Sequence, residues 1–276
     1  MRYAQLVIGP AGSGKSTYCS TIEKFCQDAR RPIKVINLDP AAENFSYEPI
    51  VDIRDLIQLD DACEDEDLHY GPNGGLIFCL EYLAENLEWL TEQLGEEQED
   101  YILFDCPGQI ELYTHLDVMP RLVAHLRRLE FSLCSVFLVD SQFMTEPAKF
   151  ISGVMSAMSA MVTLEIPHLN VLTKMDLLTK HTRKQLDRFL VPDIQLFLQE
   201  EQSSCRWGKK YSKLNAAICS LIEDYSIVKF LPFDIKSQES IEELLLTIDN
   251  AIQYGEDLDV KIRYPEDEDE MEEDDT

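Results

Sequence analysis

The hydrophobic positions of this chain form short apolar runs that alternate with longer stretches of helical periodicity. Each run is brief and rich in branched or aromatic residues, which is typical of a buried strand. The six runs cover residues 3–8, 33–38, 101–104, 135–139, 169–173 and 227–232. Because strands that alternate with helices build parallel sheets covered on both faces, the pattern predicts an α/β fold with a mainly parallel sheet.

Leucines mark the apolar face of a helix that should follow a turn at residues 71–74. They recur at spacings of three and four, as Leu76, Leu80, Leu83, Leu87, Leu90 and Leu94. Such a stripe could form a coiled-coil seam with another chain, but it covers fewer than about three heptads. A helix packed on its own sheet is therefore the favoured interpretation.

The last part of the chain has three sections. Residues 181–224 have the pattern of extra helices inserted between the last two strands. A final helix is expected from about Ser237 to about Gly255. Residues 256–276 are strongly acidic and are predicted to be disordered. We therefore expect one domain over residues 1–255, followed by a tail.

Composition limits which partners the chain is expected to bind and in which cellular compartment it is expected to work. A net charge of -28 would repel a nucleic-acid backbone or an anionic membrane, so we expect neither as a direct partner. The longest uncharged run, residues 150–164, is short for a membrane span and predicts a buried helix. The eight cysteines form no CxxC pair, and Cys79, Cys134 and Cys219 lie inside apolar runs. With no room for a signal peptide before the first strand, these features predict a reduced, cytoplasmic setting.

Residues 9–16, GPAGSGKS, match the phosphate-binding pattern GxxxxGKS between a strand and a helix. Glycines let backbone N–H groups turn toward phosphate oxygens, Lys15 would reach the β- and γ-phosphates, and Ser16 would bind Mg²⁺. The expected nucleotide contacts of this loop are Gly12, Ser13, Gly14, Lys15, Ser16 and Thr17. The pattern predicts a nucleoside triphosphate with Mg²⁺ as the ligand.

A nucleoside triphosphatase also needs a carboxylate near the metal, and Asp105 provides one at the end of the third run. A lone carboxylate would be costly there without a cation or hydrogen-bond donors. Gly108 completes a DxxG pattern, typical of GTPases that sense the γ-phosphate. Gln109 and Glu111 follow, and they could orient water, couple the loop to a partner, or simply belong to a surface loop.

Asp39 ends the second run, in the segment NLDPAAENF of residues 37–45. An aspartate before proline could merely cap the next turn. Beside a phosphate site it could instead hold the attacking water or the water shell of the metal, and we favour this second role.

Residues 170–176, NVLTKMD, place Thr173, Lys174, Met175 and Asp176 after a late strand, where GTPases usually carry Asn-Lys-x-Asp. A carboxylate suits guanine because N1–H and N2–H₂ are paired donors, whereas adenine presents an acceptor at N1. Lys174 can lay its aliphatic stem along the base. Thr173 should lose an amide that braces the loop, so the prediction is a guanine preference that is less strict than usual.

Gly71, Pro72, Asn73 and Gly74 predict a rigid turn ahead of the leucine-rich helix. Pro72 would preset φ at the second turn position, Asn73 tolerates positive φ at the third, and glycine suits the fourth. Such a turn would hold the Asn73 amide outward in a fixed pose. The alternative is a simple helix entry.

In this order, the P-loop, NLDPA, the Gly-Pro-Asn turn, FDCPGQIE and TKMD resemble the GPN-loop GTPase family over nearly the whole chain up to about residue 255. Within the family, DPAAENF, FLVDSQFM and YGEDLD are most similar to the third eukaryotic paralogue. The resemblance implies a GTPase of the P-loop class that acts as a dimer, either with itself or with the first paralogue. It also implies that Gly71, Pro72 and Asn73 reach the partner's nucleotide, where Asn73 would stabilise the transferring phosphoryl group. Because Asn73 is neutral and cannot cancel charge as an arginine finger does, we expect slow turnover.

The resemblance further implies a role in assembling RNA polymerase II, whose subunits would be clients, and in its nuclear import, with shuttling between cytoplasm and nucleus. Four methionines could line a groove for a client peptide, although core filling is the simpler interpretation. They are Met144, Met155, Met158 and Met161.

Two rival functions stay open. A P-loop small-molecule kinase would need an arginine-rich lid, which the sequence does not display. A non-catalytic client-binding module would use nucleotide only to hold a dimer open.

Overall fold

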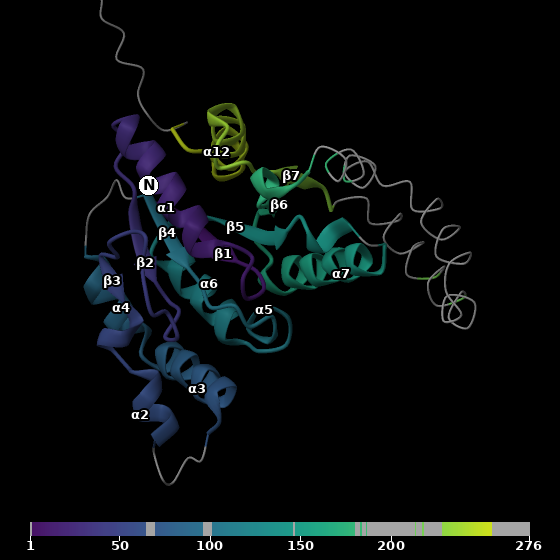
Figure 1. The fold of residues 1–276 in the computed structure, drawn as a ribbon. Coiled ribbons are helices and arrows are strands. Elements are labelled where there is room, and N and C mark those ends of the chain that lie inside the picture. The colour runs from purple at the N-terminus through teal and green to yellow at the C-terminus, as the bar shows by residue number, and fades with distance from the viewer. Residues whose placement is uncertain are drawn as a thin grey trace, which may run out of the picture.

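A seven-stranded parallel sheet forms the centre of the computed structural model, in the order β3-β2-β4-β1-β5-β6-β7 (Figure 1). The structure describes residues 2–64, 70–95, 101–145, 147–179 and 228–255, together with residues 183, 186, 213 and 217. The strands are β1 (Arg2–Ile8), β2 (Lys34–Asn37), β3 (Val51–Asp52), β4 (Tyr101–Asp105), β5 (Phe131–Asp140), β6 (His168–Thr173) and β7 (Phe230–Pro232).

All six predicted strands are present, which confirms the predicted fold class. The sequence pattern missed β3, because two residues at the sheet edge are too few to show an alternation. It also began β5 too late, since the strand starts at Phe131 rather than at residue 135. β7 is shorter than expected and begins at Phe230, while residue 227 lies outside the described part of the chain.

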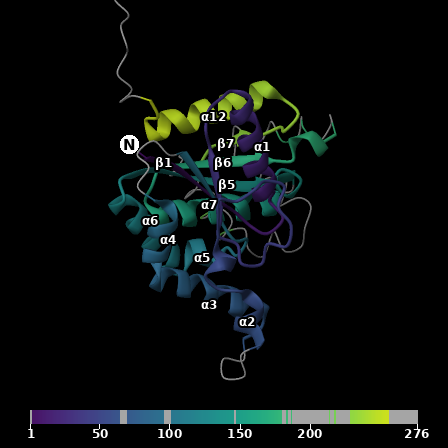
Figure 2. The same cartoon turned by 90° about the vertical axis from the view of Figure 1, so that its left-hand side faces the viewer.

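Helices cover both faces of the sheet, as Figure 2 shows. One face carries α1 (Lys15–Asp28) and α12 (Gln238–Ile252). The other carries α3 (Pro72–Glu85), α4 (Leu87–Leu94), α5 (Glu111–Thr114), α6 (Val118–Arg128) and α7 (Pro147–Leu164). A short α2 (Leu59–Glu64) packs on α3, and 3-10 turns lie at Ile53–Asp55, Phe143–Thr145 and Met175–Leu177.

Each face of the sheet has its own hydrophobic core. In β1, Leu6 and Ile8 belong to the core beneath α3 to α7, whereas Val7 belongs to the core beneath α1 and α12. Successive side chains of a strand point to opposite faces, so a strand that is buried on both faces is apolar throughout. This explains why the predicted strands appear as continuous apolar runs.

The leucine stripe faces the chain's own core. Leu76, Leu80, Leu83, Leu90 and Leu94 are buried and Leu87 packs against them, which favours the intramolecular interpretation over a coiled-coil seam. The prediction of one helix was wrong, because the stripe is divided between α3 and α4 at Asn86. The Asn86 side chain donates to the carbonyl of Tyr82 at 2.8 Å, and asparagine competes in this way with helical hydrogen bonding.

The other sequence expectations have mixed outcomes. Residues 150–164 lie within α7, and among the described residues no helix is long and apolar enough to cross a membrane. The final helix begins where expected, with Ser237 as its N-cap. Cys79 and Cys134 are buried, whereas Cys219 lies outside the described residues. The tail over residues 256–276 and nearly all of the predicted insertion over residues 181–224 also lie outside them, so the domain boundaries stay a prediction.

Candidate functional site

The loop between β1 and α1 has the geometry of a phosphate-binding loop. Gly9, Gly12 and Gly14 have φ values of 140°, 76° and 93°, which side-chain-bearing residues rarely adopt. A Cβ atom on Gly9 would lie 2.3 Å from the carbonyl oxygen of Leu138, so only glycine fits there. The first amides of α1 have no partners within the helix, and they carry the positive end of its dipole. The loop can therefore bind an anion through its backbone.

Lys15 begins α1 and points back over the loop. Its ammonium donates to the carbonyls of Gly9 and Pro10, both at 3.3 Å. Burial lowers the pKa of Lys15, while the charges of Asp105 and Asp39 act in the opposite direction. These interactions place Lys15 together with both predicted carboxylates.

Asp105 ends β4 and is 2% exposed. Its Oδ2 accepts a hydrogen bond from the Tyr47 hydroxyl at 2.7 Å, whereas its Oδ1 has no hydrogen-bond partner among the described residues. Burial raises the pKa of Asp105, and Tyr47, Ser16 and Lys15 oppose that shift. A buried acceptor without a partner is costly, so the Oδ1 atom is suited to a cation or to water bound to one.

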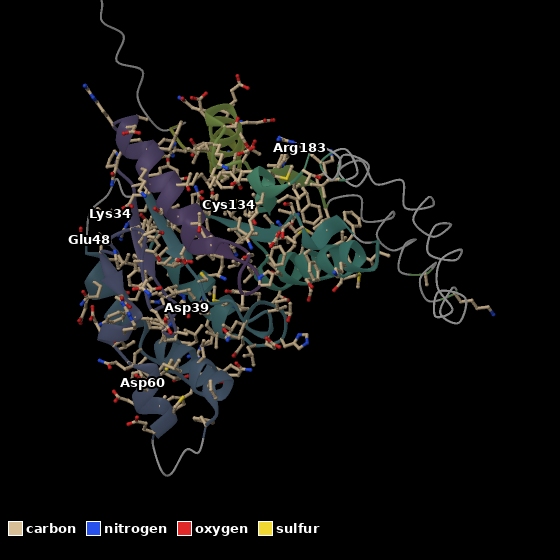
Figure 3. All side chains as sticks on the ribbon, in the orientation of Figure 1. Lys34, Asp39, Glu48, Asp60, Cys134 and Arg183 are labelled. Carbon is tan, nitrogen blue, oxygen red and sulfur yellow. The ribbon has the colours of Figure 1, made fainter. Side chains whose placement is uncertain are left out.

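Asp39 follows β2 at the same edge of the sheet, where Figure 3 labels it. The buried Asn37 amide braces it, donating to the Asp39 carbonyl and accepting from the Asp39 N–H, both at 3.0 Å. Its Oδ1 accepts from the N–H of Ala41 at 3.0 Å, as the simple capping role required. Burial raises the pKa of Asp39, while the Ala41 bond and the charge of Lys15 lower it. The carboxylate thus caps a turn and also faces the P-loop lysine.

Gly108 joins the loop after β4 to the P-loop. A Cβ atom there would lie 2.7 Å from the Ala11 Cα and 2.9 Å from its nitrogen. Gln109 is half-buried, and its Oε1 has no hydrogen-bond partner among the described residues. Glu111 is exposed at the start of α5.

The loop after β6 is tied to the P-loop by Thr173. Its hydroxyl donates to the carbonyls of Ser13 at 2.6 Å and Val139 at 3.2 Å. The expectation that threonine leaves this loop without a brace is therefore wrong, because the hydroxyl does the bracing that an amide was expected to do. Gly14 also lies against Thr173, at 3.9 Å from where its Cβ would be.

The rest of the loop after β6 carries two charged side chains, Lys174 and Asp176. Lys174 has a left-handed backbone with φ of 58°, and its ammonium pairs with Asp140 at 2.7 Å. The side chain of Asp176 is 9% exposed and pairs with Lys236 at 3.2 Å. Met175 is buried and belongs to the core. Asp176 is thus a fixed acceptor at the carboxyl end of β6, where ligands of α/β folds bind.

Gly71, Pro72 and Asn73 form a helix entry rather than the predicted turn. Gly71 is the N-cap of α3, Pro72 is its first residue, and Asn73 does not have a positive φ. The prediction of a turn was wrong because proline's fixed φ fits the first turn of a helix as well as a β-turn. Asn73 is exposed, and its side chain makes no hydrogen bond to any other described residue.

Two hollows flank the P-loop side of α7. One, of about 260 Å³, is lined mainly by P-loop residues, the end of β5, Phe143 and α7. The other, of about 280 Å³, includes Glu111 and Met155 in its lining. Of the four methionines predicted for a groove, Met144 is fully buried, Met158 and Met161 are half-buried, and Met155 is 36% exposed. Met155 is the one of these four methionines that lines the second hollow, so the peptide groove stays a hypothesis.

Sequence reasoning missed several residues that shape the site. The carboxylate of Asp105 is held by Tyr47, and Asp39 is held through Asn37, Asp52 and Arg54. Each of these contacts includes a residue that belongs to no motif, so nothing in the sequence indicated that they would pair. Asn37 carried a weak signal, since a fully buried amide at a strand end needs partners.

The chain is similar to proteins that fit this geometry. A family model described as a conserved hypothetical ATP binding protein matches residues 7–254. GPN-loop GTPase 3 of Danio rerio is 60% identical over 260 residues, which cover 94% of this chain and 91% of the relative. GPN-loop GTPase 3 of Saccharomyces cerevisiae is 47% identical over 262 residues, with coverages of 94% and 96%.

A solved structure has the same fold. The crystal structure of a GTPase in apo form from Pyrococcus abyssi matches with a TM-score of 0.71 and 22% identity, covering 90% of this chain and 97% of the other. The description of the family model names ATP, whereas the names of the relatives specify a GTPase. The chemistry of the base-facing loop therefore decides between the two nucleotides.

Proposed function

The chain belongs to the family of GPN-loop GTPases, and from this premise we propose that it binds GTP and hydrolyses it to GDP and phosphate. The observation that carries the proposal is the glycine-rich loop, where the buried Lys15 donates to the carbonyls of Gly9 and Pro10 and where the charges of Asp105 and Asp39 act to raise its pKa. An isolated lysine buried there would be costly without anionic partners. Because this loop also exposes helix-end amides, a bound triphosphate would meet both fixed dipoles and a fixed cation.

Each side chain has a role that follows from its surroundings. Lys15 would exchange its two carbonyl partners for phosphate oxygens and offset the charge that develops on them. Gln109, with an unpartnered Oε1, could accept a hydrogen from the attacking water. Asp39 faces Lys15 and is positioned by Asn37, so it is suited to order water at the same place.

Mg²⁺ fits the residues present. Among the described residues, no group of three or more His, Cys, Asp or Glu could hold a metal by itself. Mg²⁺ needs no such group, because it is usually held by one or two carboxylates together with phosphates and water. Ser16 and Asp105 would hold it, with Asp39 in reach of its water shell, and the ion would supply positive charge to the β- and γ-phosphates.

Guanine is the base that the loop after β6 supports. The Asp176 carboxylate offers two acceptors to the paired N1–H and N2–H₂ donors of guanine, whereas adenine would present a lone pair to it. Thr173 fixes the start of this loop to Ser13, so the base and phosphate contacts share one frame. We therefore assign GTP as the nucleotide, although the description of the family model names ATP.

We also infer that two chains act together, with Asn73 entering the nucleotide site of the partner. Its exposure at the start of α3 and its lack of partners within the described chain support this role. An amide can orient or hydrogen-bond the phosphoryl group, but it cannot cancel charge as an arginine does, so turnover should be slow. The partner would be a second copy or the first paralogue of the family.

A cellular role follows from the family alone. We propose that the nucleotide-dependent dimer is an assembly switch for RNA polymerase II subunits and that it accompanies them from the cytoplasm to the nucleus. The partly exposed Met155 lines a hollow between α5 and α7, and this supports a client contact there.

The test is GTP hydrolysis per subunit against protein concentration, for the chain alone and with the candidate paralogue. Activity should rise with concentration or appear with the partner, because each site needs the other chain. Asn73→Ala should lower the single-turnover rate about 10-fold or more at saturating dimer, since it removes one donor to the transition state. Asn250→Ala, an exposed helical asparagine on α12, is the matched control and should not change the rate.

Two outcomes would count against this account. A rate for Asn73→Ala equal to that of the wild type would remove the trans role. Tight GTP binding without any hydrolysis, alone or with the partner, would favour the binding-module alternative.

A further inference from the structure

A tyrosine outside every nucleotide-binding motif contacts the carboxylate at the centre of the site. Tyr47 is 7% exposed, and its hydroxyl donates to Asp105 Oδ2 at 2.7 Å across 58 residues of sequence. The contact joins two segments that lie far apart in the sequence.

The segment around Tyr47 is fixed from two sides. On one side, the Ser20 hydroxyl of α1 donates to the carbonyl of Ser46 at 2.8 Å. On the other, the rings of Phe45 and Tyr47 lie 5.3 Å apart, and the Arg54 guanidinium lies 4.8 Å above the Phe45 ring. Because Phe45 and Ser46, the two residues before Tyr47, are held by these contacts, the position of the Tyr47 hydroxyl is fixed.

This hydrogen bond makes the two carboxylate oxygens of Asp105 different from each other. Oδ2 is engaged by Tyr47, while Oδ1 is buried and has no hydrogen-bond partner among the described residues. Rotation of the carboxylate would break the 2.7 Å bond from Tyr47 to Oδ2. The hydroxyl thus keeps Oδ1 available as an acceptor in one orientation.

The same segment holds the second carboxylate. Arg54 donates to Asp52 at 2.6 Å and to the carbonyl of Ala42 at 2.9 Å. Asp52 in turn accepts from Asn37 at 2.9 Å, and Asn37 braces Asp39. Residues 37–54 therefore form one connected frame behind both carboxylates of the site.

We propose that Tyr47 is a positioning residue for cation binding, which holds Asp105 so that its free oxygen is presented to Mg²⁺. The inference rests on the proposed GTPase function and adds a residue that no motif contains. Hydrogen-bonded partners of metal-binding carboxylates typically change metal affinity about 10- to 100-fold when they are removed. Tyr47 would act on the cation through Asp105 and would not touch the nucleotide.

The experiment measures the dissociation of a fluorescent GDP analogue as a function of free Mg²⁺, for the wild type and for Tyr47→Phe. The half-effective Mg²⁺ concentration should rise about 10-fold or more in Tyr47→Phe, because the carboxylate loses its fixed orientation. Affinity for the same nucleotide in excess EDTA should stay unchanged, which a general loss of structure would not allow.

Tyr101→Phe is the matched control. Tyr101 lies on the same strand as Asp105, is also buried, and its hydroxyl likewise contacts a carboxylate, Asp249, at 3.3 Å. Its removal should leave the Mg²⁺ dependence as in the wild type. In an Asp105→Asn background, adding Tyr47→Phe should cause no further change, because the residue acts through that carboxylate.

Three results would overturn the inference. One is a wild-type Mg²⁺ dependence in Tyr47→Phe, and another is an equal shift in Tyr101→Phe. The third is an undiminished effect of Tyr47→Phe on the Asp105→Asn background. A wild-type protein that binds no guanine nucleotide with or without Mg²⁺ would instead overturn the proposed function itself, and this inference with it.

Discussion

In the proposed function, Asp176 is the residue that selects the base. Its Oδ2 atom pairs with the exposed Lys236, so the carboxylate is already oriented at the end of the loop that follows β6. The proposed contact with guanine places two carboxylate acceptors opposite two donors of the base. The residue can therefore be tested by changing the pattern of donors without changing the size of the side chain.

Asp176→Asn should lower GTP affinity about 5- to 150-fold, corresponding to the loss of about 1–3 kcal/mol of a paired contact. The new amide can donate to the C2 carbonyl of xanthine, so affinity for xanthosine triphosphate should rise. Competition between GTP, ATP and xanthosine triphosphate for a fluorescent nucleotide checks both changes. Equal affinity of the wild type for GTP and ATP would contradict the assigned base.

At the scale of elements, α12 is held to the sheet by a cluster around Arg31. The guanidinium makes two bonds to Asp249 on α12, at 2.6 and 2.8 Å. It also lies over the rings of Tyr101 and Tyr254, at 4.4 and 3.9 Å. Burial disfavours the charge, but the hydrogen bonds and charge of Asp249 outweigh it and raise the pKa of Arg31. The pair stays ionised and joins the end of α1 to the last helix.

Arg31→Ala should lower the free energy of unfolding by about 3 kcal/mol, because Asp249 would remain largely buried without its cation. Urea unfolding followed by circular dichroism measures this change. Glu85→Gln is the matched control, since its ion pair with Arg121 is exposed and should contribute no more than about 0.5 kcal/mol. Equal costs for the two variants would mean that apolar contacts alone hold α12.

The elements also show what local sequence can and cannot specify. The strands and the P-loop were predictable, because residues close together in the chain determine apolar runs and glycine spacing. The break at Asn86 and the start of α3 at Pro72 were not, since both residues suit more than one local structure. The contacts of Tyr47 with Asp105 and of Thr173 with Ser13 join distant segments, and no pattern within one segment encodes them.

For the molecule as a whole, a buried histidine links folding to pH. His168 begins β6, its Nδ1 contacts the Ser135 hydroxyl at 2.5 Å, and its Nε2 lies 3.1 Å from Oδ1 of the Asn170 side chain. Because that oxygen can only accept, Nε2 carries the proton and Nδ1 accepts. Burial lowers the pKa of His168 to about 4, although Asn170 acts in the opposite direction.

Stability should therefore fall as the pH drops below the ordinary histidine pKa of about 6.5, because the unfolded chain then binds a proton that the folded chain refuses. Between about pH 7.5 and about pH 5, His168 should cost about 2 kcal/mol of unfolding free energy. Urea unfolding at both pH values measures the loss, which His168→Gln should reduce. The control variant His115→Gln changes an exposed histidine and should show the same loss of unfolding free energy as the wild type. An unaltered pH dependence in His168→Gln would contradict the assignment.

The absence of a side chain at Gly108 has a mechanical consequence. The loop after β4 lies so close to Ala11 that no atom fits between the two backbones. Neither loop can move toward the other, so we expect a displacement of the P-loop to displace the segment that leads into α5 as well. Such coupling would depend on backbone packing and would involve no charge.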